Sequence, residues 1–257
     1  MSASTGHSVH VLDIRTGNEV GSFETGDKPH DNVCTDGGRY LWNMSIGEVH
    51  TPFDDPAMDF TKGDRRITVV DTRTFDVVRV IDMRERLDAA GLEKFSDALR
   101  PAVFSPDESR PYFQVSFFNG FLEYDVAEDR ITRVKTLPKN PDTTENRTKW
   151  VNDSRHHGIS MNPSGERLCV AGTMDDYATI VNRETLEEGP LVPSGKPYWA
   201  TVNGDGSHCV ISESADDRVS AIDFTTTGEK VASIPFGDHP QRIRLGHVPR
   251  AWAASGR

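Results

Sequence analysis

Short apolar runs alternate with polar turns along most of the chain. The clearest pair of copies spans residues 157–195 and 198–237, whose first residues lie 41 positions apart. Each copy holds four short apolar runs in a fixed order, joined by turns rich in Gly, Asn, Asp and Pro. These residues supply the backbone angles and side-chain hydrogen bonds that tight antiparallel connections need. The pattern therefore predicts four short antiparallel strands in each copy.

Two further copies precede this pair, and insertions stretch them without changing the order of the runs. Four strands repeated at roughly 40 to 45 residues are the signature of a β-propeller blade. We therefore predict an all-β fold, a five-bladed β-propeller that forms a single domain over residues 1–257. The blades are expected at residues 30–83, 100–138, 157–195, 198–237, and 241–257 plus 1–29.

The two ends of the chain each hold part of a blade. From Gln241 only 17 residues remain, enough for two strands, and residues 1–29 supply two more apolar runs at 9–14 and 19–23. We predict that both termini build the fifth blade, because such closure ties the ring together and leaves no long exposed sheet edge. The alternative is a fragment of a longer propeller.

Composition narrows the classes of partner. The net charge of -11 and the pI near 5.3 argue against electrostatic binding to nucleic acid or to an anionic membrane. No apolar stretch approaches the length that spans a membrane, and residues 1–6 have neither a basic start nor an apolar core. We therefore expect a cytoplasmic protein with a small-molecule substrate and leave its oligomeric state open.

Three cysteines occur in the chain. Cys34, Cys169 and Cys209 lie in or beside predicted strands and lack the spacing of a metal site. We expect them to be reduced and to act as small core residues.

Two segments combine an aspartate, a Thr-Gly turn, a strand and a junction from Gly to Pro. They read VLDIRTGNEV at residues 11–20 and GKPYWATV at residues 195–202, and the junction recurs at 26–30 and 237–241. These segments resemble the YVTN repeat, a β-propeller family of bacteria and archaea. Proteins of similar architecture include lactonases, streptogramin-type lyases, nitrous oxide reductase with its histidine-bound copper, and interaction scaffolds. The resemblance implies the fold and leaves the activity open.

Five residues that open the copies are expected to form a ring. In a propeller the first strand of each blade is innermost, so these residues should converge at one mouth of the central channel. Insertions at residues 48–64, 84–99 and 139–155 should emerge on the same face, because strands alternate in direction. Such loops on one face indicate a lidded pocket. The ring residues are His30, Arg100, His157, Tyr198 and Gln241.

The middle insertion has apolar residues among charges. Leu87, Leu92, Phe95 and Leu99 occur at spacings typical of a short amphipathic helix.

The histidines of the ring suit a divalent transition metal, since neutral imidazoles with a nearby carboxylate offer nitrogen and oxygen donors. We expect His30 and His157 as the first ligands, with Glu48, His50 or His239 completing the set. The metal would be Zn, Cu, Fe, Mn or Ni, and it would polarise a carbonyl or activate water. The alternatives are histidines that bond only to backbone and water, and acid–base catalysis without metal.

The remaining ring residues are candidates for substrate contact. His30 and His157 are the expected acid–base groups, Arg100 would stabilise an anion, and Tyr198 would contact the substrate. Trp199 is expected to fill the core, with substrate binding as its alternative. The other candidate substrate-binding residues are Gln241, Arg242 and Phe118.

Two functions from different classes follow. The first is a small-molecule enzyme, a metal-dependent lyase, hydrolase or isomerase, with its site at the mouth of the channel. The second is a non-catalytic scaffold that binds a protein or ligand, with an exposed apolar patch around Phe117, Phe118 and Phe121. A nicotinamide or flavin site is not indicated, because no Gly-rich loop leads from a strand into a helix.

Overall fold

The structure of this chain is a computed structural model that describes residues 1–3, 5–49, 56–224 and 228–246. Antiparallel β-sheet dominates it, in agreement with the predicted all-β class. The described strands form four four-stranded sheets and one three-stranded sheet, each with its strands in chain order. This arrangement is propeller-like, with one sheet for each predicted blade.

The N-terminal sheet is formed by β1 (Ser2–Ala3), β2 (Ser8–Leu12) and β3 (Glu19–Glu24). The first four-stranded sheet is formed by β4 (Pro29–Thr35), β5 (Tyr40–Ser45), β6 (Arg66–Asp71) and β7 (Val77–Asp82). The second consists of β8 (Leu99–Phe104), β9 (Pro111–Val115), β10 (Gly120–Asp125) and β11 (Arg130–Thr136). The third consists of β12 (Ile159–Met161), β13 (Arg167–Gly172), β14 (Tyr177–Asn182) and β15 (Val192–Pro193). The last consists of β16 (Pro197–Val202), β17 (His208–Glu213), β18 (Arg218–Asp223) and β19 (Lys230–Pro235).

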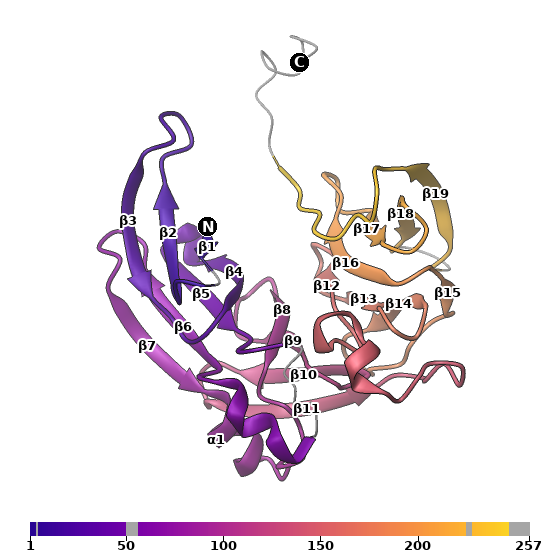
Figure 1. Ribbon diagram of the computed structural model, residues 1–257. Coiled ribbons are helices and arrows are strands. Elements are labelled where there is room, and N and C mark those ends of the chain that lie inside the picture. The colour runs from indigo at the N-terminus through magenta and orange to yellow at the C-terminus, as the bar shows by residue number, and fades with distance from the viewer. Residues whose placement is uncertain (4, 50–55, 225–227, 247–257) are drawn as a thin grey trace.

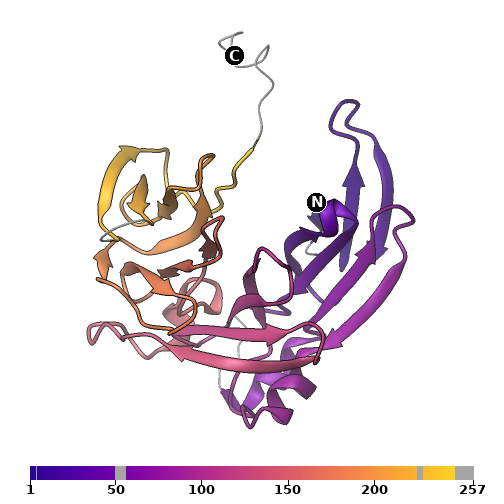
Figure 2. The same ribbon diagram turned by 180° about the vertical axis from the view of Figure 1, so that it is seen from behind.

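The five sheets follow one another in an arc, from indigo β1–β3 to orange and yellow β16–β19 (Figure 1). The view from behind shows the same succession and the same open side between the first and last sheets (Figure 2). The first strands of consecutive sheets, β1, β4, β8, β12 and β16, contact each other in turn. These strands therefore form the inner wall of the arc, as expected for a propeller.

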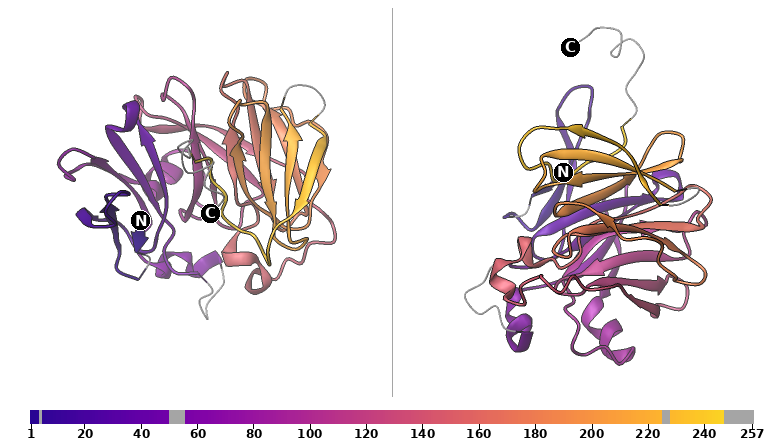
Figure 3. Two further views of the ribbon diagram at one scale, coloured as in Figure 1. Left: turned by 90° about the horizontal axis from the view of Figure 1, so that it is seen from above. Right: turned by 90° about the vertical axis from the view of Figure 1, so that its right-hand side faces the viewer.

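Closure of the ring by both termini is not confirmed. Residues 241–246 form no strand, and residues 247–257 lie outside the described part of the chain. Seen from above, the segment that follows β19 runs toward the middle of the arc (Figure 3). The inner position of the N-terminal sheet is occupied by β1, which pairs with β2 at Ser2↔Val9.

The predicted turns follow from local chemistry. Between β12 and β13, the amide of Gly165 donates to the carbonyl of Asn162 at 2.9 Å, and Oδ1 of Asn162 accepts from the amide of Arg167 at 2.9 Å. Gly165 has φ +75°, a conformation that favours glycine. The turn therefore needs both the Asn side chain and the Gly backbone.

The helices in the described part of the chain are short. α1 (Met83–Ala89) begins at Asp82, whose side chain accepts from the amides of Arg84 and Glu85. Among the described residues, four short 3-10 segments lie at Asp36–Gly38, Pro56–Lys62, Arg147–Lys149 and Val151–Asp153. The predicted amphipathic helix is thus present but shorter than its apolar pattern, because Leu92 and Phe95 follow its end and Leu99 begins β8. No helix in the described ranges is long and apolar enough to cross a membrane.

Apolar side chains between neighbouring sheets form the core. The largest cluster joins the β4–β7 and β8–β11 sheets around Ile67, Leu99 and Phe113, and it also takes in Leu87 of α1. A second cluster joins the last two sheets around Ile180, Ile211 and the two cysteines of β13 and β17. Burial of these side chains gives the main drive for packing one blade on the next.

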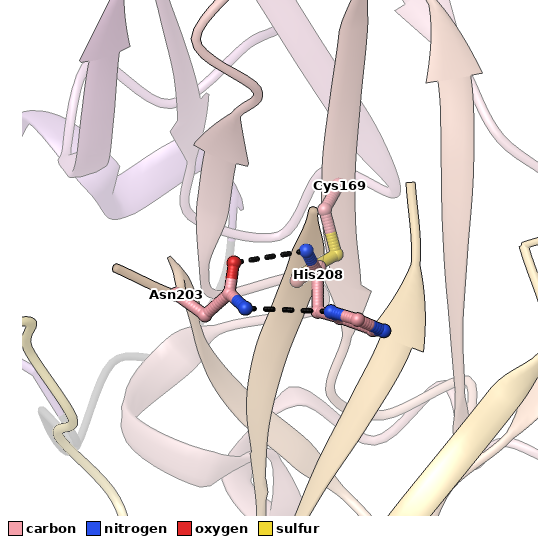
Figure 4. The surroundings of a disulfide bond; sticks show 4 residues. Cys169, Asn203 and His208 are labelled. Carbon is pink, nitrogen blue, oxygen red and sulfur yellow. Dashed lines mark hydrogen bonds between the residues drawn. A yellow bond between two sulfur atoms is a disulfide. The ribbon is translucent and has the colours of Figure 1, made fainter. Parts of the chain in front are cut away.

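A disulfide links Cys169 of β13 to Cys209 of β17, 40 residues further along the chain (Figure 4). The prediction of reduced cysteines is therefore wrong for this pair. It is also wrong to place Cys34 in the core, since this free cysteine is exposed. The physical reason is the repeat itself, because a separation close to the period brings equivalent strands of neighbouring blades side by side.

Candidate functional site

β-bulges place three of the ring residues. The strand pairing is irregular between Pro29 and Asp31, between Leu99 and Ala102, and between Pro197 and Trp199. His30, Arg100 and Tyr198 lie inside these irregularities, at the start of their inner strands. A bulge redirects the side chain of its extra residue and is frequent beside active sites. The repeat therefore places the extra residue of a bulge at the same point of several blades.

The fourth residue, His157, lies just before β12. The next residue, Gly158, has φ +124°, and a Cβ there would lie only 2.8 Å from the Cα of Trp199 and from the carbonyl oxygen of Tyr198. The absence of a side chain thus allows β12 and β16 to approach closely. As a result the ring of His157 stacks on that of Tyr198, with centroids 4.0 Å apart.

His30 and His157 form a buried pair. Their Nε2 atoms lie 3.2 Å apart, and Nδ1 of His157 lies 2.9 Å from the carbonyl oxygen of Tyr198. That carbonyl can only accept, so Nδ1 of His157 carries the proton and its Nε2 accepts from Nε2 of His30. Nδ1 of His30 is then an unprotonated nitrogen. It is buried and has no hydrogen-bond partner among the described residues.

Burial and positive neighbours keep both imidazoles neutral. Desolvation lowers the pKa of His30 and of His157 well below the usual value, and the charges of Arg100 and Arg242 lower it further. Each ring therefore stays unprotonated at neutral pH, as a general base must be before it takes up a proton. The lowered pKa also makes each ring a weaker base than a free imidazole.

A polar chain connects this pair to Arg100. Nη2 of the fully buried Arg100 donates to the carbonyl oxygen of Asn152 and to Oγ of Ser116. Nδ2 of Asn152 donates to the hydroxyl oxygen of Tyr198 at 3.1 Å. Nε and Nη1 of Arg100 have no hydrogen-bond partner in the described ranges, and burial lowers its pKa. Arg100 thus contributes positive charge and two available donors.

The first and third of the predicted insertions contact each other. Lys62 and Asp153 form a buried ion pair at 2.8 Å, which joins the first insertion to the third. The same two insertions are joined by Arg147 and Asp59 at 2.9 Å. Asn152 belongs to the third insertion and contacts both Arg100 and Tyr198. The third insertion therefore reaches the ring residues themselves.

A hollow of about 400 Å³ lies beside His30 on the inner wall of the arc. Asp31 and Trp199 line it, together with Arg242 and Arg244 of the segment after β19. The guanidinium carbons of these arginines lie 5.4 and 4.6 Å from the centroid of a ring of Trp199. Arg244 also forms an ion pair with Asp31, whose pKa is raised by burial. The hollow therefore has an aromatic wall and an excess of positive charge.

The structure does not bring every candidate residue to this place. Glu48 is exposed and pairs with Lys28 at 3.1 Å, and His239 is exposed, with its backbone amide donating to Asp217. Gln241 lies near β17, where its carbonyl accepts from Ser212. Phe118 packs on Phe95 of the core, with ring centroids 4.6 Å apart. His50 lies outside the described residues.

The proposed metal set is accordingly reduced to His30 and His157 at this site. The described ranges contain no group of three or more His, Cys, Asp or Glu side chains arranged to hold a metal ion. Trp199 is buried against both histidines, with its ring centroid 6.5 Å from that of His30 and 5.5 Å from that of His157. It therefore packs in the core, as expected, and also lines the hollow.

Two contributing residues were missed by the sequence analysis. Asn152 lies in an insertion, and its φ of +47° and its contacts depend on tertiary packing. Arg244 follows Arg242 at a spacing of two, which places both side chains on one side of an extended segment. This spacing could have pointed to Arg244 from the sequence alone. No feature of the sequence pointed to Asn152.

Comparisons with known proteins show a shared fold and no function. No family model matches the chain, and no curated protein matches it. A solved structure of a functionally unknown protein from Desulfotomaculum acetoxidans is similar, with a TM-score of 0.64 and 9% sequence identity. The match covers 93% of this chain and 66% of that protein. The YVTN resemblance stays a prediction.

Proposed function

We propose that the protein is a small-molecule enzyme of the lyase, hydrolase or isomerase class, with proton transfer at the His30–His157 pair. One observation carries this proposal. A buried, neutral imidazole with an unpartnered nitrogen borders a hollow that contains two arginines. Buried polar atoms are nearly always satisfied, and an exception is expected where a ligand completes the set.

The arrangement suits an anionic substrate. Arg242 and Arg244 would hold a carboxylate or phosphate against Trp199, and Nδ1 of His30 would remove a proton from the neighbouring carbon or from water. As His30 gains that proton, its Nε2–H is directed at Nε2 of His157. The positive charge of Arg100 would stabilise negative charge that develops on the substrate.

A metal-dependent version of the same site is the second candidate. Two imidazole nitrogens on one tetrahedral ion at about 2.0 to 2.1 Å lie roughly 3.3 Å apart. The Nε2 atoms are 3.2 Å apart, and Nδ1 of His157 bonds to a carbonyl, as in many metal-bound histidines. Three nearby arginines oppose a divalent cation, so we place this candidate second. Zn, Cu, Fe, Mn or Ni would need further ligands from water or substrate.

The test combines activity with metal content. The variants His30→Gln and His157→Gln are compared with His239→Gln, which changes an exposed histidine away from the site. The proteins are assayed with a panel of lactones, esters and hydroxy acids that carry a carboxylate or phosphate, before and after dialysis against a chelator. Loss of a general base should lower turnover by about 10²- to 10⁴-fold in the first two variants only.

Each outcome decides between the candidates. Turnover that survives chelation supports acid–base catalysis, whereas near-stoichiometric bound metal that is lost in both histidine variants supports the metal site. Turnover that is unchanged in His30→Gln and His157→Gln would sink both. A protein that binds the panel compounds but converts none of them is the non-catalytic scaffold.

We also propose that residues 241–257 complete the fifth blade with residues 1–29. The support is the ion pair between Arg244 and Asp31 of β4, which holds the segment after β19 on the inner wall beside the N-terminal sheet.

The predicted cytoplasmic location remains a proposal, and the Cys169–Cys209 disulfide favours an oxidising compartment instead. Thiol counting on protein extracted with an alkylating reagent would decide between these locations.

A further inference from the structure

A second and larger hollow lies away from the histidine pair. It measures about 630 Å³ and is bounded by the 3-10 segment Pro56–Lys62 and the residues that follow α1. Phe60 and Phe95 supply apolar walls, and Phe60 is strongly exposed. The charged side chains that line the hollow are three basic and three acidic ones, namely Arg65, Arg84, Lys94, Asp59, Glu93 and Asp97.

Arg65 provides unused donors in this hollow. Only 6% of the residue is exposed, and its Nη2 donates to the carbonyl oxygen of Asp59 at 2.5 Å. Its Nε and Nη1 are buried and have no hydrogen-bond partner in the described part of the chain. Leaving two donors of a guanidinium unsatisfied is costly, so a bound acceptor would stabilise the site. A carboxylate is the acceptor that an arginine binds best.

Asp97 pairs with Arg65 and keeps accepting capacity at one oxygen. Its Oδ1 lies 2.6 Å from Nη2 of Arg65 and forms a buried ion pair with it, and no described residue donates an aligned hydrogen bond to this oxygen. The residue is 7% exposed, and burial raises its pKa. An ammonium group would supply the missing donor.

The other charged groups of the lining are either paired or balanced by a group of opposite charge. Arg84 is fully engaged with Asp88, Leu92 and Phe95, and Asp59 pairs with Arg147. The exposed residues Lys94 and Glu93 add one charge of each sign to the rim. The hollow therefore offers one buried positive and one buried negative group side by side, next to aromatic walls.

We propose that this hollow binds a free α-amino acid with an aromatic side chain. Its carboxylate would bond to Nε and Nη1 of Arg65, its ammonium group to Oδ1 of Asp97, and its ring would pack between Phe60 and Phe95. This zwitterion matches the lining better than an anion, because it leaves the charges of the Arg65–Asp97 ion pair balanced and adds a donor for Oδ1 of Asp97, whereas an anion would place a second negative charge beside that carboxylate. The site is independent of the function proposed for the histidine pair.

Calorimetric titration of the full chain with L-phenylalanine tests the proposal. Two matched probes, 3-phenylpropionate and 2-phenylethylamine, each lack one charged group. We expect L-phenylalanine to bind at one site per chain and at least about tenfold more tightly than either probe, since each lost charged hydrogen bond corresponds to that factor or more. Asp97→Asn should weaken L-phenylalanine binding and leave 3-phenylpropionate binding unchanged or stronger.

Variants separate binding from folding. Arg65→Met should lower affinity for L-phenylalanine at least about tenfold. If it lowers the melting temperature as well, Lys94→Met at the exposed rim replaces it, with an expected loss of about threefold. The control Arg130→Met removes an exposed ion pair with Glu128, outside the lining, and should bind normally. No binding at millimolar L-phenylalanine, or equal binding of 3-phenylpropionate, would overturn the proposal.

Discussion

Reduction of the Cys169–Cys209 disulfide should lower the free energy of unfolding by about 4 kcal/mol. The bond closes a loop of 40 residues, and the loop-closure entropy it removes from the unfolded chain is about 13 cal/mol/K for that length. Both cysteines are fully buried in the cluster between the last two sheets, so the reduced thiols stay packed there. The loss therefore arises mainly in the unfolded state.

Urea unfolding followed by tryptophan fluorescence measures this loss in buffers with and without a phosphine reductant. The melting temperature should fall by about 8 to 16 °C for a chain of this size. Cys34→Ser is the matched control, because Cys34 is free and exposed, and it should change neither value. Equal midpoints in both buffers, with mass spectrometry showing three alkylated cysteines only after reduction, would refute the reasoning.

Two further predictions concern the inner wall. Because burial lowers the pKa of His30 and His157 below 6.5, the unfolded chain binds more protons than the folded one in mildly acidic solution, so the free energy of unfolding should fall as the pH drops below about 6.5. Nitrogen-15 spectra should show both rings neutral at pH 7, and a charged ring there would contradict this. Arg244→Ala should destabilise the protein by about 1 to 3 kcal/mol in urea unfolding, because it leaves the carboxylate of Asp31 buried with one partner fewer. Arg242→Ala, which removes no ion pair given by the structure, should cost less, and an equal loss in both variants would show that the Asp31 contact is not the cause.

The repeat pattern was enough to predict the strands and the starting points of the blades. Apolar runs of five to six residues bounded by turns such as Asn162 to Gly165 encode both strand and connection locally, and the observed β12–β14 and β16–β19 follow them closely. The same pattern predicted that His30, Arg100, His157 and Tyr198 open inner strands. Local sequence could do this because strand alternation and turn chemistry act over a few residues.

Tertiary structure decided what these residues do. Only packing shows that Gly158 lets His157 stack on Tyr198 and that Asn152 joins Arg100 to that tyrosine. Packing also shows that Glu48 pairs with Lys28 and that the backbone of His239 bonds to Asp217. Likewise, the disulfide between Cys169 and Cys209 depends on the lateral contact of two blades. Such contacts join residues far apart in the chain, and they are fixed by the shape and burial of the whole arc. The sequence by itself therefore determined the strands and the four residues at the start of the inner strands, whereas the pairing of the histidines and the charge of the hollow came from the way the blades pack.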